Sequence, residues 1–220
     1  MSKTNVTFLS VVIVLTCGLH VLADSWPLPT PQKYYSENKR YYIEVIPRVL
    51  ESQLKYFEGK VAKREPAGSK PGVKDNYCKG IFYKQNEDGK YERVWESRLS
   101  NDVAPVGALV SDGGQYVVTF DNWHSVGYGD DVVAIYGPGG KLIRKMSLMD
   151  IFPQNSIVKL PRSVSSIYWG GKHHIDEKKR HLVLKVVSKW SGSFQDEPEY
   201  KELRVDLGTG ELIREGQAAE

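Results

Sequence analysis

The sequence has little excess charge, few cysteines and no long apolar run beyond its first residues. Its 220 residues include 30 lysines and arginines against 27 aspartates and glutamates, which leaves a net charge of +3. This balance excludes a strongly basic nucleic-acid-binding surface, and the 40% content of hydrophobic residues excludes wholesale disorder. We therefore expect one globular domain or two small ones, with a packed core.

Sequence fingerprints of catalysis are also missing. The chain has no His-Glu-x-x-His, Gly-x-Ser-x-Gly, Walker or dinucleotide-binding motif, and Cys78 lies in no local protease signature. No enzyme class follows from the residues, so we expect a protein without enzymatic activity.

The first 23 residues have the pattern of a cleavable signal peptide. Lys3 precedes the apolar residues 6–17, and a Val-Leu-Ala triplet ends at Ala23, directly before Asp24. An apolar stretch of about a dozen residues is shorter than the roughly 20 that a membrane-spanning helix needs. We predict cleavage after Ala23 and export to the periplasm or the extracellular space, with no stable membrane span afterwards.

Removal of residues 1–23 would leave Cys78 as the only cysteine. No intrachain disulfide is then available, so the stability of the mature protein depends on its core or on a partner. A lone cysteine is either buried as a small apolar side chain or exposed for pairing with another molecule. Cys78 comes shortly before the strand-like residues 80–83, which favours burial.

The mature sequence is typical of an all-β protein. Residues 24–32 are rich in proline, which fixes φ and removes amide donors, so they predict an extended lead-in. Short β-branched and aromatic runs separated by Gly, Asn and Asp turns follow. The clearest predicted strands are residues 41–46, 116–120, 131–136 and 181–187.

Helices are a minor part of this expectation. At most one or two short ones are predicted, at residues 49–59 and 147–150, where apolar spacing and an N-cap signature favour them. Residues 58–77 are rich in Lys, Gly and Pro and predict a long surface loop.

Two short sequence elements each occur three times along the chain. The first is a polar turn that opens into an apolar strand, and it begins at Ser36, Ser111 and Asp176. The second is a glycine turn followed by a strand with an arginine four residues after the glycine, at residues 88–93, 139–144 and 209–214. The two alternate, as expected for three four-stranded antiparallel units with a hairpin at each turn. We place the units at about residues 33–100, 105–150 and 163–216, within a β-repeat domain of residues 33–216.

This alternation resembles the β-propeller families, loosely those with WD-like and periplasmic propeller repeats, whose blades alternate Ser-Asp-Gly and Asp-Gly-Lys turns with strands. The resemblance covers about residues 34–214, and residues 111–144 are the best copy. Closed propellers have about 4 to 8 blades, whereas this chain has material for three. The resemblance therefore implies an open arc of sheets, or a subunit that completes a ring with another copy; a β-sandwich is the alternative. It implies a binding scaffold more often than an enzyme.

A chemically rich loop, residues 121–131, joins two of the predicted strands. Binding sites are often built on loops held between rigid strands. Aromatic rings here would stack on a sugar or peptide while polar groups supply hydrogen bonds, so the expected ligand is a protein, a peptide or a glycan. In the alternative, purely structural interpretation, the polar side chains cap turns and the rings cover the core. The candidate binding residues are Asp121, Asn122, Trp123, His124, Tyr128, Asp130 and Asp131.

A divalent metal site is a second hypothesis. His173 and His174 belong to the unit after the one that contains Asp121 and His124, and histidine with carboxylate suits zinc or a similar ion. Adjacent residues in a strand point to opposite faces, so both histidines would bind one ion only if the preceding glycine pair bends the chain. This hypothesis corresponds to a metal-assisted hydrolase or lyase. A third hypothesis is a structural subunit that self-associates.

Overall fold

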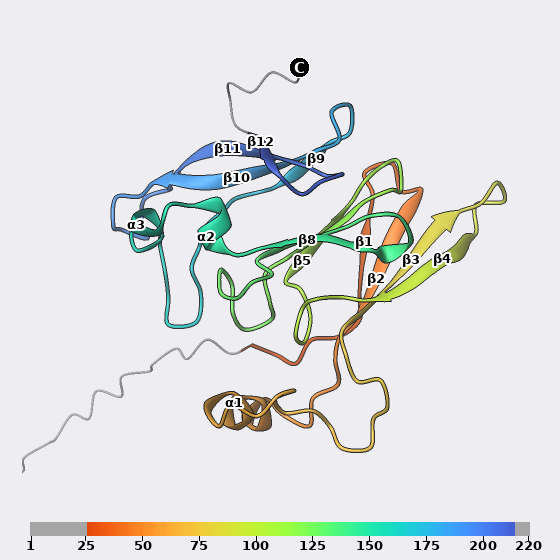
Figure 1. Cartoon of the computed structure of the whole chain (residues 1–220), viewed down its shortest axis with the longest axis horizontal. Helices are drawn as coiled ribbons and strands as arrows, with labels where there is room; N and C mark the ends of the chain where they lie inside the picture. Colours follow the sequence, from red (N-terminus) through yellow and green to blue (C-terminus); the bar gives the residue numbers. More distant parts are fainter. Residues whose placement is uncertain (1–25, 214–220) are drawn as a thin grey trace, which may run out of the picture.

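The structure is a computed structural model that describes residues 26–213. Twelve strands in this part of the chain form three four-stranded antiparallel sheets, none of which closes into a barrel (Figure 1). In every sheet the strands lie side by side in the order in which they occur along the chain. The fold is therefore all-β and built from three similar units, as the repeated turns predict.

Sheet 1 contains the first four strands, with a long excursion between its second and third strands. After β2 the chain leaves the sheet to form the helix α1 (Gln53–Val61), and then returns to the sheet. The helix lies apart from the sheets, on the side of the molecule opposite sheet 3 (Figure 1). The strands of sheet 1 are β1 (Gln32–Tyr35), β2 (Tyr41–Ile46), β3 (Lys79–Gln85) and β4 (Tyr91–Arg98).

Sheets 2 and 3 follow the same plan with shorter connections. Sheet 2 consists of β5 (Gly107–Val110), β6 (Val117–Phe120), β7 (Val133–Tyr136) and β8 (Leu142–Met146), and the 3-10 turn η1 (Pro138–Gly140) lies between its last two strands. The helices α2 (Leu148–Ile151) and α3 (Gln154–Ile157) lead toward sheet 3. Sheet 3 consists of β9 (His174–Asp176), β10 (His181–Lys189), β11 (Glu199–Asp206) and β12 (Leu212–Ile213).

The two repeated sequence elements form equivalent hairpins. The element that opens with a serine or aspartate joins strands one and two of each sheet, and we call this connection the first hairpin. The glycine element joins strands three and four. In each first hairpin the opening side chain caps its own turn, because a hydroxyl or carboxylate oxygen there accepts backbone amides. Ser36 Oγ accepts from Tyr41 N, Ser111 Oγ accepts from Tyr116 N, and Asp176 Oδ1 accepts from Lys179 N. The turn chemistry visible in the sequence is thus what sets these hairpins.

The three first hairpins also contact one another across the sheets. The backbone N of Asn38 in sheet 1 donates to Asp112 Oδ1 in sheet 2 at 2.8 Å. The backbone N of Asp112 in turn donates to Glu177 Oε1 in sheet 3 at 2.6 Å. The two acceptors, Asp112 and Glu177, occupy the same position in their turns, so a similar hydrogen bond recurs from sheet to sheet, although the donors Asn38 and Asp112 differ by one position.

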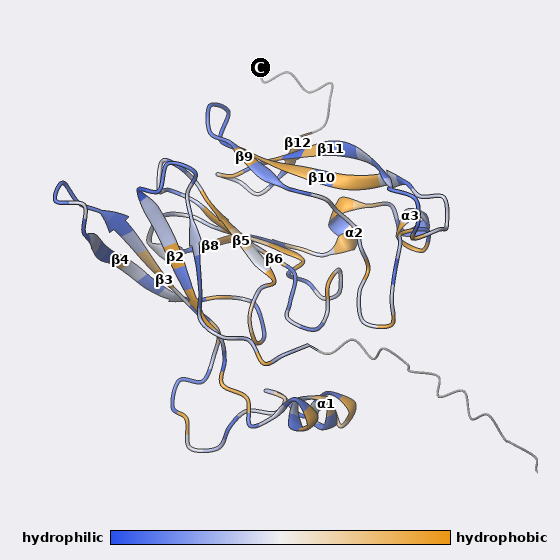
Figure 2. Cartoon of the chain, turned by 180° about the vertical axis from the view of Figure 1, so that it is seen from behind, coloured by the Kyte–Doolittle hydropathy of each residue, from blue (hydrophilic) through white to orange (hydrophobic). Residues whose placement is uncertain are grey.

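Sheet 2 lies between the other two sheets and is buried on both faces. One face, with Val117 and Ala134, packs on Ile43 and Phe82 of sheet 1. The other face, with Val118 and Ile135, packs on a cluster of sheet 3 side chains that includes Leu182, Leu184 and Val186. Figure 2 shows hydrophobic residues along β10 and hydrophilic residues at the hairpin tips. The continuous apolar run of β7 and the complete burial of β6 follow from this arrangement.

The helices differ in detail from the sequence-based expectation. Three short α-helices occur in the described residues, one more than expected. The helix α1 begins after Ser52, whose side chain accepts from Lys55 N, and it extends to Val61, so the first residues of the predicted surface loop are helical. The predicted turn at residues 147–150 is confirmed, since Ser147 and Asp150 form a capping box at α2.

The side chain of Cys78 is buried, with 1% of its surface exposed, as predicted. Desolvation by burial raises the pKa of its thiol to about 12, so the sulfur is protonated and unreactive at neutral pH. The predicted signal peptide with Cys17, and the last repeated arginine, Arg214, lie outside the described residues. Among the helices within residues 26–213, none is long and apolar enough to span a bilayer.

Candidate functional site

A pocket of about 400 Å³ lies between helix α1 and the loop of residues 121–131. Helix α1 is held here by a small apolar cluster in which Tyr56 packs with Leu50, Val103 and Trp123. The pocket therefore has one wall from an excursion of sheet 1 and another from a loop of sheet 2. We call it the α1 pocket. Its lining residues are Tyr56, Phe57, Lys60, Ser100, Asp102, Asn122, His124, Ser125, Tyr128, Gly129 and Asp131.

Asp102 organises the charged side of the α1 pocket. The buried Arg48 donates from Nη2 to Asp102 Oδ1 at 2.9 Å, and Arg48 Nε donates to the backbone oxygen of Asp102 at 3.0 Å. The other carboxylate oxygen accepts from Tyr56 OH at 3.2 Å and lies 2.9 Å from Lys60 Nζ. This network fixes the position of α1 against the sheets, because three of its members come from different segments.

The network also sets the protonation of its members. Burial, followed by the negative charge of Asp102, raises the pKa of Tyr56 to about 12, so its hydroxyl stays a donor. For Lys60, burial lowers the pKa, but hydrogen bonds to Glu65 and Asp102 outweigh it and leave the pKa raised. The α1 pocket thus carries a permanent ammonium beside a carboxylate.

Asp121 is a structural anchor of the loop. Its backbone has a φ of 55°, and its Oδ1 accepts from Gly127 N at 2.7 Å and from Trp169 Nε1 at 3.0 Å. Gly127 must be glycine here, because it has a φ of 76° and a Cβ would lie 2.8 Å from Ile167. Desolvation by burial raises the pKa of Asp121 to about 6 despite these hydrogen bonds.

Asn122 connects the loop to the segment before sheet 2. Its Oδ1 accepts from Asp102 N at 3.2 Å and from Asn101 Nδ2 at 3.3 Å, while its Nδ2 donates to Asp131 Oδ1 at 2.6 Å. Burial is the main cause of the raised pKa of Asp131. The hydrogen bond between Asn122 and Asp131 therefore joins the two ends of the loop at the pocket.

Trp123 and His124 follow in the loop and differ in exposure. Trp123 is 6% exposed, and its Nε1 donates to Pro27 O of the proline-rich lead-in at 2.9 Å. His124 is half-buried, has a φ of 70°, and lies with its ring centroid 4.1 Å from that of Phe57 on α1. Trp123 supports the wall from below, whereas His124 forms part of the wall itself.

Four of the seven candidate binding residues thus line the pocket. These four are Asn122, His124, Tyr128 and Asp131, and Tyr128 is the most open of them at 41% exposed. Asp121 and Trp123 hold the loop in place instead, as the structural interpretation expected, and Asp130 is exposed outside the lining.

The wall formed by α1 was missed by sequence reasoning. Phe57 and Lys60 lie more than 60 residues before the loop. Only the helical spacing at residues 49–59 hinted that this segment is ordered.

The residues of the metal hypothesis lie in different surroundings. His173 is stacked between Phe120, at 4.8 Å, and Trp169, at 4.7 Å, and its Nδ1 accepts from Lys185 N at 3.1 Å. Burial lowers the pKa of His173 to about 4, so its ring is neutral and used in packing. His174 is exposed on β9, and His124 lies beside α1. Across residues 26–213, no group of three or more His, Cys, Asp or Glu side chains is arranged to hold a metal ion.

Comparison with protein families and with curated sequences assigns no family to this chain. No protein-family model matches the chain, and no curated protein sequence matches it significantly. The chemistry of the pocket is therefore the basis for a function.

Proposed function

We propose that this chain is an exported, non-enzymatic β-repeat binding protein that holds a polar ligand, a glycan or a peptide segment of a partner protein, in the α1 pocket. The single observation that carries the proposal is the pocket itself. It brings the exposed ring of Tyr128 and the contacting rings of His124 and Phe57 next to an ammonium and two carboxylates.

The chemistry of the lining supports a polar ligand. Lys60 donates only, while Asp102 and Asp131 accept, and the Nδ2 group of Asn122 has a second N–H beyond its bond to Asp131. Hydroxyl groups of a sugar and amide groups of a peptide need donors and acceptors side by side. The exposed ring of Tyr128 provides a flat apolar surface for the non-polar face of the same ligand.

The rigidity of the loop supports a binding role as well. Asp121 and Asn122 fix the loop from beneath with hydrogen bonds of 2.7 Å and 2.6 Å. A pocket whose walls are ordered in the free protein loses little conformational entropy when a ligand binds. Residues that look structural thus serve the site by holding its lining in place.

The test begins with a screen of the mature protein on glycan arrays and peptide libraries, followed by calorimetry of any ligand found. Tyr128→Ala should weaken binding by about 3- to 10-fold, the range expected for loss of one aromatic contact. Tyr35→Ala is the matched control, because Tyr35 is 42% exposed, close to the 41% of Tyr128, but lies on sheet 1 away from the pocket. Equal affinity of the two variants would refute the assignment of the pocket.

Export is a separate part of the proposal and has its own measurement. The pattern of residues 1–23 supports it. Mass spectrometry of the exported protein should find a mature chain that begins at Asp24. Retention of the full-length chain in the cell would contradict this part and leave the pocket unaffected.

The competing hypothesis of a metal-assisted hydrolase or lyase makes the opposite prediction in one measurement. Elemental analysis of the purified protein would then find a stoichiometric transition metal, and a chelator would lower its stability. We expect neither result, because His173 is committed to ring stacking and to the backbone of Lys185.

A further inference from the structure

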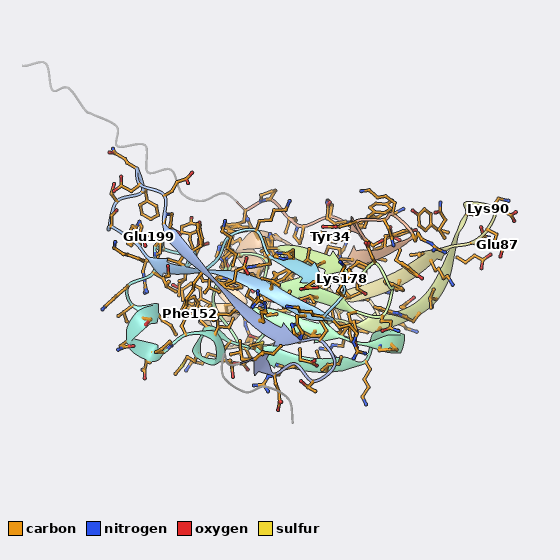
Figure 3. The ribbon with its side chains drawn as sticks, turned by 90° about the horizontal axis from the view of Figure 1, so that it is seen from above. Tyr34, Glu87, Lys90, Phe152, Lys178 and Glu199 are labelled. Carbon is orange, nitrogen blue, oxygen red and sulfur yellow. The ribbon has the colours of Figure 1, made fainter. Side chains whose placement is uncertain are left out.

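A second pocket, of about 430 Å³, lies on sheet 3, where the connection from β10 to β11 meets the segment before β9. Glu199, at the start of β11, marks this end of the molecule, and the β3–β4 hairpin tip with Glu87 and Lys90 lies at the other (Figure 3). We call it the sheet 3 pocket. Aromatic rings dominate its lining, from Tyr168, Trp190, Phe194 and Tyr200.

The rings of the sheet 3 pocket stand at steep angles to one another. Phe194 lies 6.2 Å from Tyr168 at an interplanar angle of 88°, and 5.3 Å from Trp190 at 57°. A sugar ring stacks best on one open, flat aromatic surface, whereas rings at steep angles form the walls of a cage around a compact group. Phe194 is 67% exposed, so the cage is open to a ligand from solution.

The charge of the lining is negative. Asp196 and Glu197 line the pocket, and no lysine or arginine does so among the residues described. Neither carboxylate forms an ion pair within residues 26–213, whereas the nearby Glu199 is paired with Lys189 at 2.9 Å. An aromatic cage with two unpaired carboxylates at its edge is complementary to a compact cation.

One ring of the cage already receives a cation from the chain itself. The Nζ of Lys185 lies over the ring of Tyr200, 4.8 Å from its centroid. This contact shows that an ammonium group is held against an aromatic face at this edge of the pocket, and it leaves Tyr168, Trp190 and Phe194 as the rings for a ligand. Within residues 26–213, the lining itself carries only the two carboxylates of Asp196 and Glu197.

From these observations we infer that the sheet 3 pocket binds an organic ammonium group, in a site distinct from the α1 pocket. Its ligand is a methylated ammonium or the ammonium of a lysine side chain, held by the rings of Tyr168, Trp190 and Phe194 and by the carboxylates of Asp196 and Glu197.

The experiment compares two probes of the same shape and different charge. Choline should bind the mature protein in a calorimetric titration, and its uncharged carbon isostere 3,3-dimethylbutan-1-ol should bind at least about tenfold more weakly, because it lacks the charge that rings and carboxylates attract. Equal affinity for both, or no choline binding at millimolar concentration, would overturn the inference.

Two variants locate the binding. Phe194→Ala should weaken choline binding by at least about threefold, the loss expected for one cation–π contact. Asp196→Asn combined with Glu197→Gln should also weaken it and reduce its dependence on salt. Both changes affect exposed side chains, so the fold should be retained.

Matched controls come from exposed positions elsewhere. Met149→Ala changes a side chain whose exposed fraction, 64%, is close to the 67% of Phe194. Glu87→Gln with Asp88→Asn removes two exposed charges from the β3–β4 hairpin. Neither should change choline affinity. If these controls weaken binding as much as the pocket variants do, the ammonium binds by non-specific attraction and the inference fails.

The source of the ammonium is decided by a third probe. A capped lysine residue and its trimethylated form are titrated beside choline. Tighter binding of either lysine form identifies a peptide ligand. Tighter binding of choline identifies a small molecule or lipid headgroup. Tyr128→Ala should leave all these affinities unchanged. A failure of the α1 pocket and a failure of the sheet 3 pocket are therefore distinguishable.

Discussion

Sheet 2 and the two terminal sheets are built from the same hairpins but have different surroundings. In sheet 2, all residues of β6 and β7 are buried, because both faces of these strands are covered. In sheet 1 the face directed away from sheet 2 carries Lys33 and Glu44, and in sheet 3 the corresponding face carries Lys185 and Glu202. The position of a unit in the array, and not its turn chemistry, decides which side chains its strands carry.

This difference shows how the array ends. In repeat proteins, terminal units with a polar outer face cap the apolar interior and keep the protein soluble. Here the cap of sheet 1 includes a group of tyrosines, in which Tyr42 is covered by Tyr35, Tyr83 and Tyr91 at centroid distances of 4.6 to 5.0 Å. We therefore expect the three sheets to be complete without a second copy to close them.

The largest expected effect distinguishes the interior from the caps. Ile135→Ala in β7 should lower the free energy of unfolding by about 4 kcal/mol, because Ile135 is fully buried in the core between sheets 2 and 3. Ile81→Ala, in which the side chain is half-buried on the outward face of sheet 1, should cost about 1 kcal/mol. Urea unfolding of both variants measures the difference, and equal losses would contradict the distinction between core and cap.

The next effect concerns two titratable groups between sheets 2 and 3. The pKa of Asp121 is raised from 3.8 to about 6, so its contribution to stability is present below pH 3.8 and is lost as the pH rises through 6. The pKa of His173 is lowered from 6.5 to about 4, so its contribution is present above pH 6.5 and is lost as the pH falls through 4. The two contributions oppose each other over the same pH range.

Asp121→Asn should therefore reveal how the free energy of unfolding depends on the protonation of His173. Relative to the unchanged protein, the variant should lose about 3 kcal/mol of stability between pH 7 and pH 4, since one pKa unit corresponds to about 1.4 kcal/mol. Chemical unfolding at several pH values measures this difference. Asp130→Asn, at an exposed position in the same loop, is the control. A pH-independent difference for Asp121→Asn would show that its carboxyl titrates normally.

A smaller effect is expected at the hydrogen bonds that link the first hairpins. Asp112→Ala removes the acceptor for Asn38 N and should cost about 1 kcal/mol. Glu37 has the same position in the turn of sheet 1 but accepts no hydrogen bond within residues 26–213, so Glu37→Ala should cost less than about 0.5 kcal/mol. Thermal unfolding of the two variants tests whether stability depends on the hydrogen bond between the hairpins or only on the charge that is removed.

The smallest effect is expected on the outward face of sheet 3. Glu202→Gln removes an exposed charge and its ion pair with Arg204, and should change stability by less than about 0.5 kcal/mol. Light scattering should find the same mass before and after the substitution. Conversion of an oligomer into a monomer would instead show that this face is an interface between copies.

Much of the fold was predictable because its signals are local. The capping side chains Ser36, Ser111 and Asp176 bond within their own turns, so the hairpins could be recognised from short stretches of sequence. The strands β6, β7 and β10 were predictable from their apolar runs, which reflect burial on both faces or on one long face. The relation between sheets, by contrast, has no local signature.

The candidate site was predictable only in part, for the same reason. The loop of residues 121–131 has a conspicuous composition, but which of its polar groups face the pocket depends on partners elsewhere. Asp121 is directed to Trp169, and Asn122 to Asp102, through contacts that no short pattern encodes. Likewise, membership in neighbouring units did not bring His124 and His173 into one ligand group.

The repeated hydrogen bond between first hairpins has a direction, and this bears on how the chain could be lengthened. Each turn donates its backbone amide to the carboxylate of the next turn, from Asn38 to Asp112 and from Asp112 to Glu177. A duplicated copy of sheet 2 inserted beside the original would present the same amide and the same carboxylate. One new apolar contact would form, between the face that now meets sheet 3 and the face that now meets sheet 1. The two caps need not change. We therefore expect that the number of sheets can be changed in the interior while the two ends stay fixed.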